Sequence, residues 1–111
     1  MSLNFQNIKG DTFEAVNFEV KINDTAVNLT GAVIKMQLRK ECGGVIGLTL
    51  TSIEDTGITI YDAVNGKFKI NKQIINIPEY NYYYDIEIHF SDNTVKTWVK
   101  GMFNILCDIT R

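Results

Sequence analysis

Residues 80–90, with the sequence YNYYYDIEIHF, decide the fold of this chain. Large apolar or aromatic side chains occupy every second position, namely Tyr80, Tyr82, Tyr84, Ile86, Ile88 and Phe90. The positions between them are polar except for Tyr83. Successive side chains of a strand point to opposite faces of a sheet, so this period of two predicts a long strand with one buried and one outward face.

The residues that follow predict a hairpin partner for this strand. A two-residue turn at Asp92-Asn93 would pair Phe90 with Val95, Ile88 with Thr97, Ile86 with Val99, Tyr84 with Gly101 and Tyr82 with Phe103. Inward residues then meet inward residues. On the outward face the same register sets Asp85 opposite Lys100, Glu87 opposite Trp98 and Tyr83 opposite Met102.

The same alternation recurs in shorter runs toward the N-terminus, within residues 16–22, 34–38, 46–50, 58–60 and 68–70. Turn-forming residues separate them at Asn23-Asp24, Thr30-Gly31, Gly43-Gly44, Asp55-Thr56-Gly57 and Asn65-Gly66. We expect an all-β antiparallel sandwich of seven to eight strands, with a small barrel as the competing architecture. Residues 71–79 favour at most one short helical turn, which Pro78 would end.

Length and composition indicate one folded domain over residues 1–111, because 111 residues can bury a single sizeable core. Hydrophobic residues make up 45% and charged residues 22%, and the net charge is −2 without a clustered Lys/Arg stripe. Nucleic acid is therefore not an expected partner. No apolar run is long enough to span a bilayer and the start lacks the pattern of a signal peptide, so we expect a soluble chain without a membrane partner.

The two cysteines, Cys42 and Cys107, have neither the spacing nor the partners of a zinc site. We predict reduced thiols, and a disulfide between them is the alternative if the fold brings their strand ends together. No metal or cofactor is expected.

The outward face of the predicted hairpin carries the candidate functional residues. Tyr83, Trp98 and Met102 would project from it beside Glu87, and large apolar groups gathered on an outward face are typical of a protein interface. Two alternatives stay open. Another part of the domain could cover these side chains, or an aromatic ring flanked by Asp85, Glu87 and His89 could stack on a sugar.

No catalytic residue is predicted. His89 is the single histidine and would have to serve as the base of any Ser-His or Cys-His pair, with Glu87 as the orienting carboxylate, but no nucleophile is placed beside it. The phosphate-binding, zinc-hydrolase and serine-hydrolase motifs are all missing from the sequence. We therefore expect a protein that is not an enzyme.

The order of several short motifs resembles a phage domain family. The motifs are Val27-Asn28-Leu29-Thr30-Gly31-Ala32, Thr56-Gly57-Ile58-Thr59-Ile60, Asn65-Gly66-Lys67-Phe68, Tyr82 to Ile88, Thr94 to Gly101 and Phe103-Asn104-Ile105. Together they resemble the N-terminal immunoglobulin-like domain of the phage baseplate upper protein and related short tail proteins. Two features depart from that family: Asp92-Asn93 stands where an Asp-Gly turn is common, and no receptor-binding region follows Arg111.

The resemblance implies an immunoglobulin-like sandwich in a phage or prophage virion, assembled in the bacterial host cytoplasm. Its partners would be other tail or baseplate proteins, with a homo-oligomer as a further option. The predicted contacts are the hairpin face with Tyr83, Trp98, Met102 and Glu87, or an edge strand, including residues 4–7 for pairing or strand exchange. The alternative function is a carbohydrate-binding or adhesive module of a bacterial surface protein.

Overall fold

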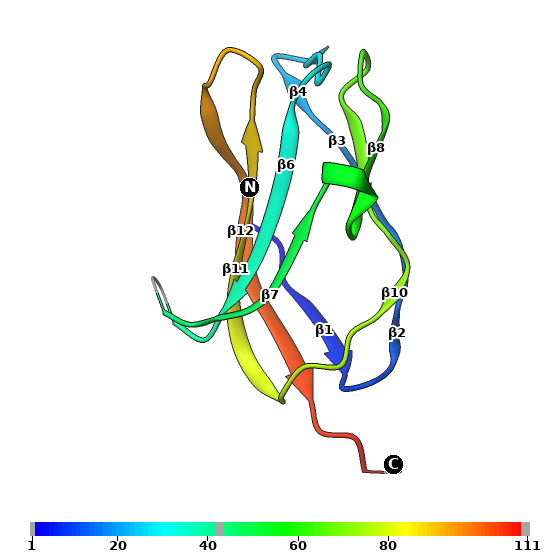
Figure 1. Cartoon of the computed structure of the whole chain (residues 1–111), viewed down its shortest axis with the longest axis vertical. Coiled ribbons are helices and arrows are strands. Elements are labelled where there is room, and N and C mark those ends of the chain that lie inside the picture. The colour runs from blue at the N-terminus through cyan, green and yellow to red at the C-terminus, as the bar shows by residue number, and fades with distance from the viewer. Residues whose placement is uncertain (1, 42–43, 110–111) are drawn as a thin grey trace.

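The computed structural model describes residues 2–41 and 44–109 and is built almost wholly of strands (Figure 1). The elements are β1 (Phe5–Ile8), β2 (Thr12–Phe13), β3 (Val16–Glu19), β4 (Lys21–Ile22), β5 (Thr25–Ala26), β6 (Val33–Arg39), β7 (Ile46–Thr51), a 3-10 turn η1 (Ile53–Asp55), β8 (Ile58–Asp62), β9 (Lys67–Ile70), β10 (Gln73–Ile74), β11 (Tyr80–His89) and β12 (Val95–Leu106). Of the twelve strands in the described residues, eight have four residues or more. The expected all-β sandwich of seven to eight strands is confirmed.

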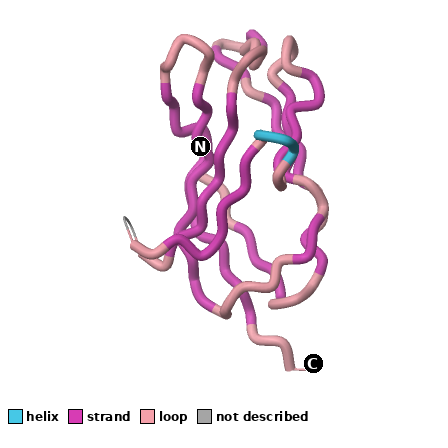
Figure 2. Tube along the Cα trace, viewed as in Figure 1, coloured by secondary structure: helices cyan, strands magenta, loops and turns pink. Residues whose placement is uncertain are grey.

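The strands form two layers that face each other across the core (Figures 1 and 2). One layer is a five-stranded sheet in the order β1-β12-β11-β6-β7. The other contains a three-stranded sheet, β3-β9-β8, and the short pair β10-β2. If β3, β6, β7, β8, β9, β11 and β12 are taken as strands B, C, C′, D, E, F and G, the sheets read B-E-D and G-F-C-C′, which is the order of an immunoglobulin-like sandwich.

A tyrosine corner supports the same assignment. The hydroxyl of Tyr82 donates a hydrogen bond to the carbonyl of Pro78, 2.6 Å away and four residues upstream. Immunoglobulin-like sandwiches place such a tyrosine near the start of strand F. The ring also lies against Gly47 of β7, where a Cβ atom would come within 2.7 Å of it. The start of β11 is thus fixed both to its preceding loop and to the sheet edge.

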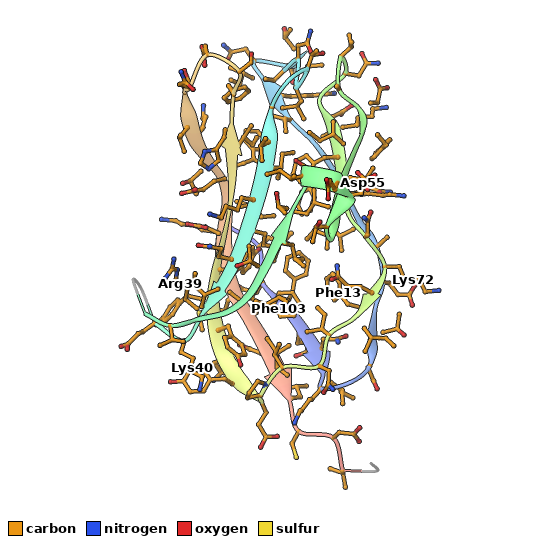
Figure 3. The ribbon with its side chains drawn as sticks, viewed as in Figure 1. Phe13, Arg39, Lys40, Asp55, Lys72 and Phe103 are labelled. Carbon is orange, nitrogen blue, oxygen red and sulfur yellow. The ribbon has the colours of Figure 1, made fainter. Side chains whose placement is uncertain are left out.

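The core consists of the inward side chains of both layers, as the period of two predicted. Ile34, Met36, Leu38, Tyr82, Tyr84, Ile86, Ile88, Val99, Phe103 and Ile105 come from the five-stranded sheet. Phe13 contacts Phe103 from the opposite layer with ring centroids 5.2 Å apart, and Figure 3 shows both between the layers. Phe18 stacks on Phe68 within the second layer at 5.0 Å. In the described residues no polar or charged residue is fully buried, so hydrophobic packing dominates this interior.

The register of the β11–β12 hairpin is confirmed from Tyr82 to Ile86 and is wrong nearer the turn. The pairs Tyr82–Phe103, Tyr83–Met102, Tyr84–Gly101, Asp85–Lys100 and Ile86–Val99 are present, but Glu87 pairs with Thr97, and Ile88 with Lys96. The connection has three residues rather than two, because Phe90 N–H bonds to the Thr94 carbonyl and Asn93 takes a left-handed conformation with φ 71°. The shift of one residue is then compensated by a β-bulge.

Trp98 is the additional residue in this bulge. It has no partner on β11, and its half-buried side chain packs against the core next to the fully buried Val99. The prediction that Trp98 projects from the outer face is therefore wrong. The physical reason is the turn, which is one residue longer than predicted and shifts the register of the first part of β12. The bulge restores the register at Val99, and Trp98 is the unpaired residue that it leaves on the inward side.

Residues 71–79 form no helical turn, which agrees with the expectation of at most one. They run extended, and β10 pairs with β2. Gly10 N–H donates to the Ile75 carbonyl and Ile75 N–H to the Asp11 carbonyl, so the loop between β1 and β2 holds Ile75 in the core. The helical turn of the described chain is η1, where Glu54 and Asp55 have positive φ angles of 52° and 54°.

The first strand gives the sandwich one parallel pair. β1 runs parallel to β12, with Phe5 beside Phe103 and Ile8 beside Leu106, so the five-stranded sheet is not wholly antiparallel as expected. Residues 4–7 were proposed for pairing with a neighbour; residues 5–7 of this segment pair with β12 within the chain, and β1 is the edge strand of the sheet. The Tyr84 hydroxyl donates to the Leu3 carbonyl, and Met102 N–H donates to the Asn4 side chain at 3.0 Å, which fixes the segment before β1 as well.

Two further expectations concern the cysteines and the membrane. Cys107 is exposed with a free thiol. Cys42 and Gly43 lie outside the described residues, so the structure does not describe the alternative of a Cys42–Cys107 disulfide or the predicted turn at Gly43-Gly44. Within residues 2–41 and 44–109 the structure contains no helix with the length and apolar character needed to cross a membrane.

Candidate functional site

The candidate site lies on the outer face of the five-stranded sheet. Strand alternation sends one set of residues from β6, β11 and β12 away from the core, and the ladders place them in rows. One row is Arg39, Tyr83 and Met102, and the next is Gln37, Asp85 and Lys100. Figure 3 shows Arg39 pointing away from the layer that contains Phe13. No described strand of the second layer covers this face.

A groove of about 560 Å³ crosses these rows. It is lined by Ser2, Asn4, Gln37, Arg39, Glu41, Tyr83, Tyr84, Asp85, Glu87, Lys100, Gly101 and Met102. A second hollow of about 630 Å³ lies toward the other end of the strands, and its lining includes Tyr80, Lys40 and Leu106. Both contain Tyr83 and Met102, so these two side chains form a ridge between the hollows. Tyr83 is 51% exposed, a large fraction for an aromatic ring on a sheet face.

The charges in the groove are of both signs. Arg39 donates from Nη1 to the Gly44 carbonyl at 2.6 Å and from Nη2 to Gln37 Oε1 at 3.0 Å, so its guanidinium is held at the groove wall. Asp85 and Lys100 are direct neighbours across the ladder, yet neither forms an ion pair with any residue in the described part of the chain.

The Asp85 carboxyl is partly removed from water in this groove. Burial raises its pKa, the neighbouring Glu87 carboxylate raises it further, and the Arg39 guanidinium acts in the opposite direction. A carboxylate in this situation gains from an additional cation, because a positive charge nearby favours its ionised form. Asp85 is therefore a carboxylate in the groove lining that forms no ion pair with described residues.

The predicted Glu87–His89 pair is present at the end of the same face. His89 Nε2 lies 3.1 Å from Glu87 Oε1, and both side chains remain more than a third exposed. No serine or cysteine side chain of the described residues forms a hydrogen bond with the His89 ring. The arrangement can take part in further hydrogen bonds, but it does not bring a nucleophile together with a base.

The structure brings together three of the four predicted interface residues. Tyr83, Glu87 and Met102 line one groove, whereas Trp98 lies on the core side of the bulge. Sequence reasoning missed Arg39 and Gln37 as members of this site. The alternation of polar and apolar residues predicted that both side chains point outward from a strand. The sequence near them does not indicate that β6 pairs with β11.

The outer face of the opposite layer differs in character. On the sheet β3-β9-β8, Glu19 forms ion pairs with Lys21 at 3.1 Å and with Lys67 at 4.0 Å. Glu19 thus has charged partners within the chain, and the exposed aromatic side chain of this sheet is Tyr61 of β8, at 49%. The described residues contain no group of three or more His, Cys, Asp or Glu side chains that could hold a metal ion.

Comparison with protein-family models, with curated proteins and with solved structures finds no match for this chain.

Proposed function

We propose that this chain is a non-enzymatic structural subunit of a phage or prophage tail or baseplate. In this role the outer face of the five-stranded sheet docks onto neighbouring subunits, which assemble in the bacterial host cytoplasm and remain in the virion. The observation that supports this proposal most strongly is the uncovered sheet face, on which the exposed Tyr83 ring and Met102 lie between two hollows. Tyrosine, methionine and arginine are enriched in protein interfaces, and aromatic anchors carry much of their binding energy.

Two further features support a docking role. The motif order from Val27 to Ile105 resembles the immunoglobulin-like domain of phage baseplate proteins. The site is also an open groove on a sheet, whereas small-molecule sites are concave and bury most of the ligand surface.

Incorporation into particles tests the proposal. Particles are purified from a phage or induced lysogen in which the gene is deleted and complemented, and quantitative mass spectrometry counts the chain in each preparation. Wild-type protein is expected in the particles at a fixed copy number. Tyr83→Lys is expected to be incorporated at a tenth of that level or less, on the order of what losing an interface anchor costs. Glu14→Lys, which introduces a lysine on the opposite layer with a larger change in net charge, should be incorporated normally.

Two results would overturn the proposal. One is a complete absence of the chain from particles whose tails remain normal after the deletion. The other is glycan binding in an array that Tyr83→Ala abolishes, together with glycan-degrading genes rather than tail genes beside this one. That combination would favour the carbohydrate-binding module, since the same ring and carboxylates could stack on a sugar and bond its hydroxyl groups.

A further inference from the structure

The two central rows of the outer face contain complementary residues in adjacent positions. Asp85 of β11 stands directly beside Lys100 of β12, and Tyr83 stands beside Met102. Asp85 and Lys100 make no ion pair with described residues, so both charges are available to a partner. A strongly acidic partner would be repelled by Asp85, and a strongly basic one by Lys100. A partner that presents both signs at the same spacing satisfies both residues.

We propose that this partner is a second copy of the chain, packed sheet against sheet about a two-fold axis that runs parallel to the strands between β11 and β12. The inference rests on the proposed docking function and names its partner. The axis sets β11 of one copy over β12 of the other at the same level along the strands. Each Asp85 then meets Lys100 of the second copy, and each Tyr83 meets Met102 of the second copy.

The shape of the face suits this arrangement. A two-fold interface uses the same patch on both copies, and an axis parallel to the strands keeps each residue at its own level. The two Tyr83–Met102 ridges therefore meet, with each Tyr83 ring against the Met102 thioether of the other copy, a favourable sulfur–aromatic contact. The two grooves of about 560 Å³ face each other around the Asp85–Lys100 pairs. Facing sheets in sandwiches pack with their strand directions within about 30° of each other, which a parallel axis between two equally twisted sheets allows.

The area is also sufficient. The five strands β1, β12, β11, β6 and β7 contain 4, 12, 10, 7 and 6 residues, and at a strand spacing of about 4.8 Å and a rise of about 3.3 Å per residue they cover roughly 600 Å². A stable interface of standard size buries about 600–1,000 Å² on each partner. One whole face of the five-stranded sheet therefore comes close to the area that a dimer requires, without any contribution from the loops.

A charge swap tests the pairing. Sedimentation equilibrium is measured for wild type, Asp85→Lys, Lys100→Asp and the double variant Asp85→Lys/Lys100→Asp, with circular dichroism to confirm that each is folded. Wild type is expected to dimerise. Each single variant should raise the dimer dissociation constant at least about tenfold, because each then places like charges together twice. The double variant should recover most of the affinity, since opposite charges again meet at both positions.

The matched control uses the exposed ion pair on the other layer. Glu14 and Lys72 lie 3.9 Å apart, and Figure 3 shows Lys72 on the side opposite Arg39. Glu14→Lys and Lys72→Glu should leave the dissociation constant unchanged. The proposal is overturned if wild type stays monomeric at high concentration, if the single variants dimerise as well as wild type, or if the double variant is no better than either.

The test also separates this inference from the docking function itself. If the protein is monomeric but wild type enters particles and Tyr83→Lys does not, docking stands and the partner is a different chain. If the charge-swap pattern is observed but the chain is absent from particles, the dimer stands and the tail function fails.

Discussion

Trp98 and Tyr83 are large side chains on neighbouring strands, and one residue of register decides their different roles. The bulge turns Trp98 toward Val99 and the core, whereas Tyr83 remains 51% exposed on the outer face. Burial of apolar surface stabilises a fold, and exposed surface contributes little until a partner covers it. Trp98 therefore contributes to the stability of the fold, whereas Tyr83 is available to bind a partner.

Alanine substitutions distinguish these roles. Trp98→Ala is expected to lower the free energy of unfolding by about 2 kcal/mol, because a half-buried indole would leave a gap at the core edge. Tyr83→Ala should change it by less than about 0.5 kcal/mol. Urea unfolding measures both. A neutral Trp98→Ala together with a strongly destabilising Tyr83→Ala would contradict the assigned bulge.

The tyrosine corner makes a second residue-level prediction. Tyr82→Phe removes the hydroxyl that bonds to the Pro78 carbonyl at 2.6 Å, and should cost about 1 kcal/mol of unfolding free energy. Tyr80→Phe is the control, because Tyr80 is exposed on the same strand and its hydroxyl makes no hydrogen bond to a described residue. If both substitutions lower the free energy of unfolding equally, the hydrogen bond of the tyrosine corner does not stabilise the fold.

Tyr84 predicts how stability changes at alkaline pH. Burial raises the pKa of Tyr84 to about 12 from an ordinary value of 10.0. The unfolded chain therefore loses this proton first, so the stabilising contribution is complete below about pH 10 and is lost as the pH rises toward 12. Tyr84→Phe should flatten this decline in urea midpoints, and Tyr61→Phe, an exposed control, should not. An identical decline in wild type and Tyr84→Phe would contradict the prediction.

At the level of elements, the packing of the N-terminal segment against β12 depends on a glycine. A Cβ atom at Gly101 would overlap the Leu3 carbonyl and lie 2.8 Å from Asn4 Oδ1. Leu3 N–H also donates to the Lys100 carbonyl at 3.1 Å, so backbone rather than a flexible side chain would have to move.

Gly101→Ala is therefore expected to cost about 1–3 kcal/mol and to release the segment before β1. Amide hydrogen exchange should become faster at Leu3, while Thr97→Ala, an exposed change on the same strand, should leave that exchange unchanged. Unchanged protection of Leu3 in Gly101→Ala would show that the close approach is not required.

The strands and turns also differ in how well the sequence predicts them. The core strands follow from alternation, because apolar side chains on one face can only be buried against another layer. The turn after β11 was mispredicted by one residue, because the left-handed conformation of Asn93 and its bond pattern are not visible in composition. For residues 71–79 the sequence predicted at most one helical turn, and it could not show that there is none, because the hydrogen bonds with residues 10 and 11 that hold Ile75 extended involve a distant segment.

On the scale of the whole molecule, the two outer faces have different properties. Glu19 of β3 forms ion pairs with Lys21 and with Lys67, whereas on the five-stranded face Asp85 and Lys100 form no ion pair with described residues. The sequence alone placed Tyr83 beside Met102 on the outward face, since the hairpin register is correct at that level, and alternation along the strand marked Glu87 as outward. Arg39 joins them through the β6–β11 pairing, a long-range contact that alternation does not specify.

Cross-linking mass spectrometry on intact particles, with a lysine-reactive reagent, tests the central claim that the five-stranded face is the docking surface. The account predicts that Lys35 and Lys100, on that face, link to neighbouring subunits, and that Lys69 and Lys72 of the other layer remain unlinked or link within the chain. Links to other subunits from Lys69 and Lys72 alone, with Lys35 and Lys100 freely modified by the reagent, would contradict it.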